Sequence, residues 1–156
     1  DIERDAEPFF HIEDGLFERV FGSNQAAMAW RCYLVTGPRG VAVGTLSAWS
    51  NPDYFGEVWG QVHWVAIRPA YQRKGLARAA LAFTLQQLAR WHTRAYLGTQ
   101  SYRLPAIRLY LEMGFLPDLR HPGAREAWTG VAAQLDHPAL VSALGLTGSL
   151  PVDSGA

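Results

Sequence analysis

Residues 65–77 read Val-Ala-Ile-Arg-Pro-Ala-Tyr-Gln-Arg-Lys-Gly-Leu-Ala and carry the strongest structural signal in this chain. The segment 65–69 predicts the end of a buried strand, Gly75 lies in a turn, and the apolar-periodic run 76–91 predicts a helix. The first turn of a helix has backbone N–H groups without internal partners and the positive end of the helix dipole. The turn therefore delivers N–H groups to a point where a phosphate would bind.

The residues around this turn favour a pyrophosphate over a neutral ligand. Gly75 allows a ligand to approach the backbone closely, and Ala77 keeps the surface low beside it. Arg73, Lys74 and Arg78 add positive charge at the same point. The turn matches neither the P-loop pattern nor the dinucleotide pattern Gly-x-Gly-x-x-Gly. Taken alone, an ordinary strand-to-helix turn is the simpler explanation.

A second block of sequence makes a ligand-binding turn the better explanation. Residues 106–115 read Ala-Ile-Arg-Leu-Tyr-Leu-Glu-Met-Gly-Phe and follow the turn, with a predicted helix and strand between them. The turn has the pattern Gln/Arg-x-x-Gly-x-Gly/Ala, and the later block has the pattern Ala-x-x-Leu-Tyr-x-x-x-Gly-Phe. In this order the two blocks resemble the acyl-CoA binding loop and the later helix of the GNAT superfamily of N-acyltransferases. The resemblance covers residues 57–117 closely.

The resemblance implies an α/β (α+β) fold with a mixed, mostly antiparallel sheet that is split into a V and flanked by helices. Alternation along an extended segment at 57–67 predicts that six residues share one face unless a bulge intervenes: Glu57, Trp59, Gln61, His63, Val65 and Ile67. The superfamily usually has a bulge in this strand, which splays it from its parallel neighbour and opens a slot for the pantetheine arm. Gly60 is one place where the bulge could lie.

The same resemblance implies how acetyl-CoA, or another acyl-CoA, would bind as co-substrate. Backbone N–H groups of residues 73–77 would hold the pyrophosphate, and main-chain groups of Val65 and Ile67 would pair with the pantetheine amides. The expected contacts are Val65, Ile67, Gln72, Arg73, Lys74, Gly75, Leu76, Ala77, Arg78, Ser101 and Arg103. The chain departs from the superfamily at Arg103, where asparagine is common, and Ser101 or Thr99 would supply the missing polar contact.

Tyr110 is the candidate general acid. It falls on the superfamily's tyrosine that commonly protonates the departing thiolate. A phenol with a reference pKa of about 10 suits this task, because that value lies near the pKa of a thiol. The alternative is an amphipathic tyrosine that packs on a helix face.

Several groups compete for the role of general base. Gln61 stands where some members of the superfamily carry a glutamate base, and glutamine cannot accept a proton. His63 titrates near neutrality and would deprotonate an ammonium directly or through water, unless it is a hydrogen-bonded, half-buried histidine. Glu57 lies further along the strand and would hold a cationic acceptor or relay protons. A water chain alone is sufficient in many such enzymes.

Length and composition set limits on the class of protein. A chain of 156 residues is long enough for one domain whose core needs no disulfide or metal. The formal net charge is zero and no long Lys/Arg run occurs, which disfavours a nucleic-acid partner. No apolar run reaches the roughly 18 residues of a membrane span, and the acidic start is unlike a secretory signal. We therefore expect a cytoplasmic protein that does not bind a membrane.

Cys32 is the only cysteine, and its apolar neighbours predict a strand interior. Neither an intrachain disulfide nor a covalent acyl intermediate is therefore expected. The histidines lack the spacing of metal ligands, so we expect no metal site.

We expect one N-acyltransferase domain over residues 1–135 and a tail over 136–156 that is flexible or packs on a partner. The other expected elements are short helices within 9–29, strands over 30–36 and 41–49 with a hairpin turn at 37–40, a loop at 51–53, a helix over 76–89, a strand over 95–99, a helix over 105–113 and a last strand over 127–135.

The resemblance implies an N-acetyltransferase that moves an acetyl group from acetyl-CoA to a primary amine, and without a suitably placed cysteine we expect direct attack in a ternary complex. The acceptor, a small-molecule or protein amine, stays open. Tyr54, Phe55 and Trp59 at the mouth of the slot would suit an acceptor with an apolar or aromatic part, and Asp53 and Glu57 would attract the amine. The alternatives are a non-catalytic acyl-CoA-binding sensor and a protein-interaction module on the same fold. A homodimer through the last strands is also compatible with the sequence.

Overall fold

The computed structural model describes residues 2–6 and 13–146 of the chain. The chain falls into two compact units, Asp1–Gly98 and Thr99–Ala156. Within the described residues, the first unit contains all the strands and the second contains only helices. A single domain over residues 1–135 stays a prediction.

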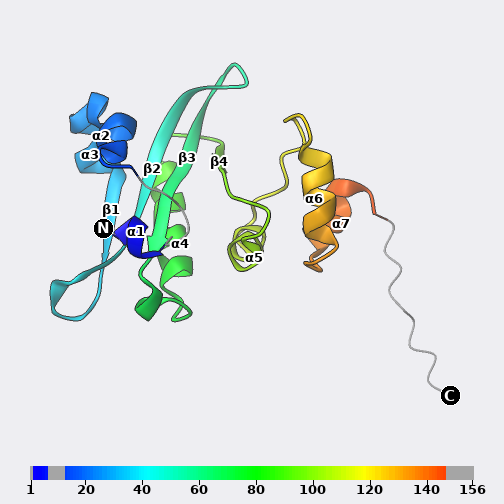
Figure 1. The fold of residues 1–156 in the computed structure, drawn as a ribbon. Helices are drawn as coiled ribbons and strands as arrows, with labels where there is room; N and C mark the ends of the chain where they lie inside the picture. The colour runs from blue at the N-terminus through cyan, green and yellow to red at the C-terminus, as the bar shows by residue number, and fades with distance from the viewer. Residues whose placement is uncertain (1, 7–12, 147–156) are drawn as a thin grey trace. The chain divides into compact units, whose positions relative to one another are not determined.

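The first unit is built on a four-stranded sheet with the order β1-β2-β3-β4 (Figure 1). The strands β1, β2 and β3 pair antiparallel, and β4 joins β3 in parallel. The mixed, mostly antiparallel sheet is therefore confirmed. The elements of this unit are α1 (Ile2–Ala6), α2 (Leu16–Phe21), η1 (Gly22–Asn24), α3 (Gln25–Arg31), β1 (Cys32–Thr36), η2 (Pro38–Gly40), β2 (Ala42–Tyr54), β3 (Glu57–Ile67), η3 (Pro69–Tyr71), α4 (Leu76–Leu88) and β4 (Ala95–Leu97).

Helices cover both faces of this sheet. Gly60 of β3 faces the end of α4, because a Cβ added there would lie 2.9 Å from Leu88 Cδ2 and 3.3 Å from His92 Cβ. Side chains alternate along a strand, so His63 points to the opposite face. There its ring centroid lies 5.7 Å from that of Phe21 in α2. Phe21 is 0% exposed, and its burial fixes α2 to this face.

The predicted hairpin forms with shifted boundaries, and a second hairpin follows it. The turn at 37–40 joins β1 to β2, but β1 begins at Cys32 because α3 continues through Arg31. The loop expected at 51–53 is wrong, since β2 continues through these residues to Tyr54. A two-residue turn of Phe55 and Gly56, both with positive φ, then leads into β3.

The bulge in β3 lies at Trp64. One residue separates Thr45 from Ser47 in β2, whereas two residues separate their partners Ala66 and His63 in β3. Trp64 has a φ of 50°, in the left-handed region that a bulky residue rarely adopts. The extra residue ends the simple alternation, so the six residues expected on one face do not all share it.

Placing the bulge at Gly60 was therefore wrong, and packing explains both positions. Gly60 lacks a side chain because Leu88 of α4 comes close to its backbone. Trp64 is held by aromatic contacts, with ring centroids 5.4 Å from Phe17 and 5.4 Å from Phe21. A glycine in the sequence indicates where another element can come close to the backbone. No feature of the sequence indicates that a tryptophan will adopt a positive φ.

The sheet opens into a V between β3 and β4, as expected. The two strands pair only from Gly60 with Ala95 to Val62 with Leu97. Beyond that point β3 continues through the bulge to Ile67 without a β4 partner. Among the described residues, no strand pairs with this edge of β3 over its last five residues.

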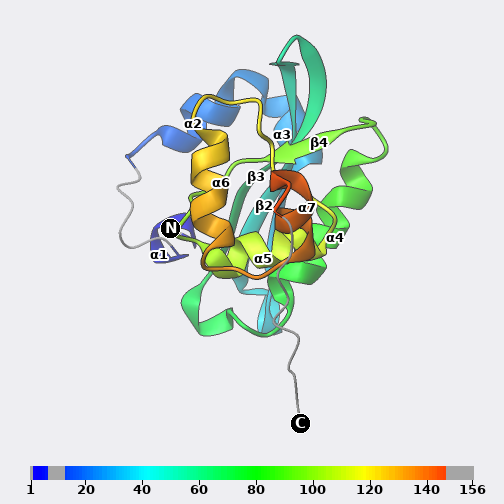
Figure 2. The same ribbon diagram turned by 90° about the vertical axis from the view of Figure 1, so that its right-hand side faces the viewer.

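The second unit contains α5 (Leu104–Glu112), α6 (Ala124–Ala132) and α7 (Pro138–Leu144). Helices α6 and α7 lie side by side (Figure 2). The core of this unit consists of Ile107, Leu111, Val131, Leu135 and Leu140. None of the helices in the described part of the chain has the length and apolar composition to cross a membrane.

One expectation for this region is wrong. The last strand expected at 127–135 is mostly helix α6, because Val131 and Leu135 recur at the four-residue spacing that faces one core. Within the expected tail, residues 138–144 form α7, and Leu140 is 0% exposed in that core. Residues 147–156 of the expected tail lie outside the described residues.

Gly44 of β2 provides a test of the packing beside the bulge. An added Cβ would lie 2.4 Å from Ile67 Cδ1 and 2.8 Å from the carbonyl oxygen of Ala66. A backbone oxygen cannot rotate away, so we expect Gly44→Ala to lower the free energy of unfolding by about 1–3 kcal/mol, a usual cost of overpacking. Chemical denaturation would measure this. Gly98→Ala is the control, because its Cβ would meet nothing within 4 Å. Equal stability of the two variants would contradict the prediction.

Candidate functional site

The loop before α4 has the backbone shape of an anion site. Arg73 and Gly75 both have positive φ, 57° and 78°. Gly75 is the N-cap of α4, and no side chain caps the helix. The helical hydrogen bonds begin with the one from Ala79 N–H to Gly75 O, which is 3.1 Å long. The N–H groups of Leu76 and Ala77 lie before this bond, so they have no partner within the helix. A Cβ on Gly75 would meet nothing within 4 Å, so the surface above these N–H groups is open.

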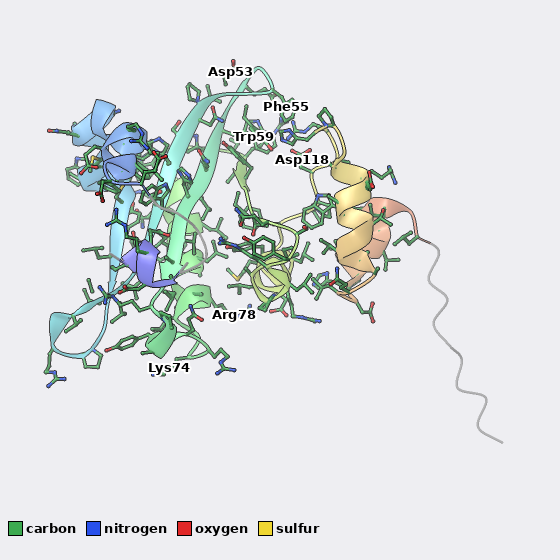
Figure 3. The ribbon with its side chains drawn as sticks, in the orientation of Figure 1. Asp53, Phe55, Trp59, Lys74, Arg78 and Asp118 are labelled. Carbon is green, nitrogen blue, oxygen red and sulfur yellow. The ribbon has the colours of Figure 1, made fainter. Side chains whose placement is uncertain are left out.

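The polar side chains of this loop brace its backbone. Gln72 Nε2 donates to the carbonyl oxygen of Ile67 at 2.8 Å, and Lys74 Nζ donates to that of Ala70 at 2.8 Å. The Lys74 ammonium also lies 5.2 Å from the centre of the Tyr71 ring. Lys74 and Arg78 lie at the same end of the first unit (Figure 3). The structure thus brings together the predicted loop residues 72–78.

The free edge of β3 leads directly into this loop. Arg68 N–H donates to Val43 O at 2.8 Å, so the backbone groups of Arg68 face β2. Backbone groups alternate along a strand, so those of Ile67 and Val65 face the other edge. On that edge the pairing with β4 has already ended at Val62. The geometry therefore fits an extended, amide-bearing ligand that pairs with β3 and ends in a phosphate at the N-terminus of α4.

His63 lies one residue before the bulge and is half-buried. Its ring centroid lies 5.7 Å from that of Phe21 and 6.2 Å from that of Trp64. Its Nδ1 is buried and has no hydrogen-bond partner among the described residues. Burial lowers the pKa of the imidazole below its ordinary value. The side chain is therefore neutral at pH 7, which is the state that a base requires.

Glu57 lies at the far end of β3, next to the β2–β3 turn. Its Oε2 accepts from Trp59 Nε1 at 3.0 Å and pairs with Arg94 Nη1 at 2.7 Å. Glu57 and His63 are six positions apart along the strand, roughly 20 Å at the usual rise per residue. The structure therefore does not bring these two predicted residues together. Figure 3 shows Asp53, Phe55 and Trp59 at this end of the unit, away from Lys74 and Arg78.

The predicted aromatic group near the turn forms a cluster that includes one residue we missed. Tyr54 contacts Phe55 and Trp59, with ring centroids 5.0 and 5.2 Å apart. Tyr96 of β4 stacks on Tyr54 at 3.8 Å, and its hydroxyl accepts from Asn51 Nδ2 at 2.8 Å. Tyr96 could not be found from the sequence, because only the parallel register of β4 with β3 places it beside this hairpin.

The remaining predicted residues belong to the second unit. Tyr110 is half-buried in α5, and its ring centroid lies 6.3 Å from that of Phe115. Phe115 N–H donates to Tyr110 O and Gly114 N–H donates to Leu111 O, at 3.1 and 3.0 Å. This is a Schellman motif, which needs a residue with positive φ at Gly114, where φ is 92°. The Gly-Phe pair of the second sequence block thus ends α5 and sets a ring against Tyr110.

Arg103 and Ser101 precede the same helix. Arg103 is the N-cap of α5, and its guanidinium lies 5.8 Å from the centre of the Tyr102 ring. Ser101 is exposed. Their contacts with acyl-CoA stay predictions, as does the role of Tyr110.

Cys32 has the properties of a structural cysteine. It is half-buried in β1, and burial raises the pKa of its thiol above the ordinary value. An activated nucleophile would show the opposite shift. Within the described part of the chain, no three His, Cys, Asp or Glu side chains lie together in a way that could hold a metal ion.

Comparison with known proteins identifies the family of this chain. The sequence profile of the Acetyltransferase (GNAT) family matches residues 2–115. The chain belongs to the GNAT acetyltransferase family. Membership supports acetyl transfer from acyl-CoA as the general activity. No curated protein gives a significant match to the chain.

Solved structures share the GNAT fold with this chain. The NatC complex bound to Gag peptide and CoA is 16% identical, with a TM-score of 0.62 over 75% of this chain and 76% of that chain. A protein of Pyrococcus horikoshii OT3 is 20% identical, with a TM-score of 0.58 over 78% and 81%. An acetyltransferase of Trypanosoma brucei is 21% identical, with a TM-score of 0.51 over 77% and 87%. At these identities the likeness shows the fold.

Two half-buried histidines, His63 and His92, predict how stability depends on pH. Burial lowers the pKa of His63, and burial together with the Arg31 guanidinium lowers that of His92. Below the unfolded pKa of about 6.5, the unfolded state then binds more protons than the folded state. We therefore expect the free energy of unfolding to fall as the pH drops from about 7 through the lowered pKa values.

His63→Gln should make this pH dependence shallower, because it removes one of the two groups. Urea denaturation over a series of pH values would measure the slope. His121→Gln replaces an exposed histidine and serves as the control. If the His63 variant keeps the slope of the wild type, His63 does not have a lowered pKa.

Proposed function

We propose that this protein transfers an acetyl group from acetyl-CoA to a primary amine, by direct attack of the amine in a ternary complex. One observation carries the proposal. The split of β3 from β4, the bulge at Trp64 and the open N-terminus of α4 form a continuous backbone path within the first unit. A pantetheine arm would lie along this path and a pyrophosphate would lie at its end.

The chain would hold the co-substrate mainly with its backbone. N–H groups of residues 73–77 would bind the pyrophosphate, where the helix dipole favours negative charge. The outward-facing groups of Val65 and Ile67 would pair with the pantetheine amides as an added strand does. The Ile67 carbonyl already accepts from Gln72, but a carbonyl oxygen has a second lone pair. N–H groups in the same segment would polarise the thioester carbonyl.

The proposed reaction forms a C–N bond and breaks the C–S bond of the thioester. A neutral amine attacks the carbonyl carbon, and the electron pair of the broken bond leaves on sulfur. His63, directly or through water, would accept the proton that the amine loses, since its lowered pKa keeps it neutral. Tyr110 would donate a proton to the thiolate. Glu57 is held at the turn by Arg94 and Trp59, so we assign it to the acceptor side rather than to proton transfer.

The acceptor is proposed only as a primary amine, on a small molecule or on a protein. A peptide amine is compatible with this fold, because the NatC complex was crystallised with a peptide. The aromatic cluster of Tyr54, Trp59 and Tyr96 would suit an acceptor with an apolar or aromatic part. A cytoplasmic location and a homodimer stay predictions.

A second candidate is an acyl-CoA-binding sensor that does no chemistry. One observation favours it: Gln61 occupies the position where some members of the superfamily carry a glutamate base. Both candidates predict binding of acetyl-CoA, and only the first predicts release of CoA in the presence of an amine.

Gly75→Glu tests the binding loop. Acetyl-CoA at about a hundred times its Kd should stabilise the wild type by roughly 2.7 kcal/mol and raise its melting temperature by several degrees. Dephospho-CoA should do so less, and free pantetheine least, because it lacks the pyrophosphate. In the variant, a carboxylate would occupy the phosphate position, so we expect the shift with acetyl-CoA to disappear.

Gly123→Glu is a matched control for this variant. Gly123 is the N-cap of α6, with φ 74° and ψ −4°, against 78° and −4° at Gly75. Neither position would bring an added Cβ within 4 Å of another group. Both substitutions place a side chain at positive φ, at a cost of about 1–3 kcal/mol. A thermal shift that survives in Gly75→Glu would exclude this loop as the acyl-CoA site.

Tyr110→Phe tests the general acid. We expect kcat to fall by about 10²–10⁴-fold, the usual contribution of a positioned acid, with no change in acetyl-CoA binding. A screen of amine acceptors that detects released CoA thiol would measure it. Tyr102→Phe, on a tyrosine that is 68% exposed, is the control. Unchanged turnover in Tyr110→Phe would remove the tyrosine from the mechanism, whereas binding without turnover in the wild type would favour the sensor.

A further inference from the structure

Strand β1 lies at the edge of the sheet, and no strand in the described part of the chain pairs with its outer side. The ladder shows which backbone groups point outward. Arg68 N–H donates to Val43 O, so Val43 faces β3 and its neighbour Gly44 faces β1. Gly44 pairs with Val35, so Val35 faces inward and the N–H and C=O of Leu34 point outward. These outward groups can accept an added strand.

β1 is short and its pairing with β2 shifts register between Val35 and Thr36, but the strand lacks the charges and proline that protect many edges. Natural edges carry charges or proline, or are covered by another element. β1 consists of Cys32–Thr36 and contains neither a charged residue nor a proline. Leu34 is 65% exposed, and Trp30, just before the strand, is 75% exposed. An open backbone edge with exposed apolar residues is typical of a surface that binds another chain.

Two arginines lie beside the start of β1. Their guanidinium carbons lie 4.4 Å (Arg31) and 5.9 Å (Arg90) from the centre of the Trp91 ring. Arg31 Nη1 donates to Ala48 O at 3.0 Å, and Arg90 Nη1 donates to Gln87 Oε1 at 3.1 Å. No carboxylate among the described residues pairs with either arginine. The open edge is therefore flanked by positive charge on a partly exposed aromatic surface.

We propose that this edge binds an extended, acidic segment of a partner protein. The segment adds a strand to β1, with hydrogen bonds to the outward groups of Leu34. Its carboxylates lie beside Arg31 and Arg90, and its apolar side chains cover Leu34 and Trp30. The surface is independent of the proposed acetyl transfer, because none of these residues belongs to the loop or to the edge of β3.

The charges disfavour a second copy of this chain as the occupant. An antiparallel pair of β1 strands centred on Leu34 would bring Arg31 of one copy opposite residue 37 of the other. Arg39 is exposed in that same turn, so like charges would meet at both ends of the pair. An acidic segment has the complementary charge.

A displayed library of random peptides, selected on the full chain, tests the proposal. We expect the enriched peptides to contain more Asp and Glu than the unselected library, with β-branched or aromatic residues at alternate positions. Their binding should weaken as salt rises, because the arginines contribute to it. A selection that enriches no peptide, or enriches basic peptides, would overturn the proposal.

Variants locate the binding surface. Leu34→Pro removes the outward N–H and leaves the ladder with β2 in place, whereas Leu34→Ala keeps that N–H and is the matched control. In fluorescence anisotropy, we expect the Kd of an enriched peptide to rise by about tenfold in Leu34→Pro and in Arg90→Glu, and by less in Leu34→Ala. Circular dichroism and melting temperature would show that each variant folds, and Arg90→Glu does not alter the strand.

Two results would overturn the assignment. Peptides that bind the wild type, Leu34→Pro and Arg90→Glu equally would place the site elsewhere. Sedimentation equilibrium would measure the oligomeric state. If the wild type is a dimer and Leu34→Pro is a monomer, a second copy of the chain occupies the edge.

Discussion

The packing of Trp64 against Phe17 and Phe21 is the interaction on which the rest of the site depends. A tryptophan with positive φ costs about 1–3 kcal/mol, and aromatic contacts of about 0.5–1.5 kcal/mol each offset this cost. The bulge held in this way sets the course of β3 beyond its pairing with β4. It therefore determines which backbone groups are available to a ligand between Val65 and Ile67.

This dependence links distant parts of the sequence. The rings that hold the bulge come from α2, about forty residues before the strand that they support. Phe21 also contacts His63 and Trp49, so one fully buried ring supports the bulge, the candidate base and the neighbouring strand. A change in α2 would therefore reach the bulge on which the proposed acyl-CoA path depends.

Three separate surfaces lie along the sheet of the first unit. The loop that precedes α4 lies at one end of β3, and Phe55 and Trp59 of the aromatic cluster lie toward the other (Figure 3). The edge of β1 is a third surface, set apart from β4 by two strands. This arrangement allows a co-substrate, an acceptor and a partner segment to use different parts of one sheet. In the second unit, the Schellman motif at Gly114 fixes the end of the helix that carries Tyr110.

The sequence by itself determined the local features of this protein. The strand, the turn at Gly75 and helix α4 follow from apolar periodicity and from a glycine with positive φ, and the Gly-Phe pair after α5 follows from the same backbone requirement. Tertiary structure alone decided the features that rest on contacts between distant residues. The bulge lies at Trp64 and not at Gly60, because aromatic packing can hold a conformation that a residue's own preferences disfavour. Residues 127–132 belong to a helix whose Val131 shares a core with residues of α5 and α7, and the partners in that core come from distant parts of the sequence.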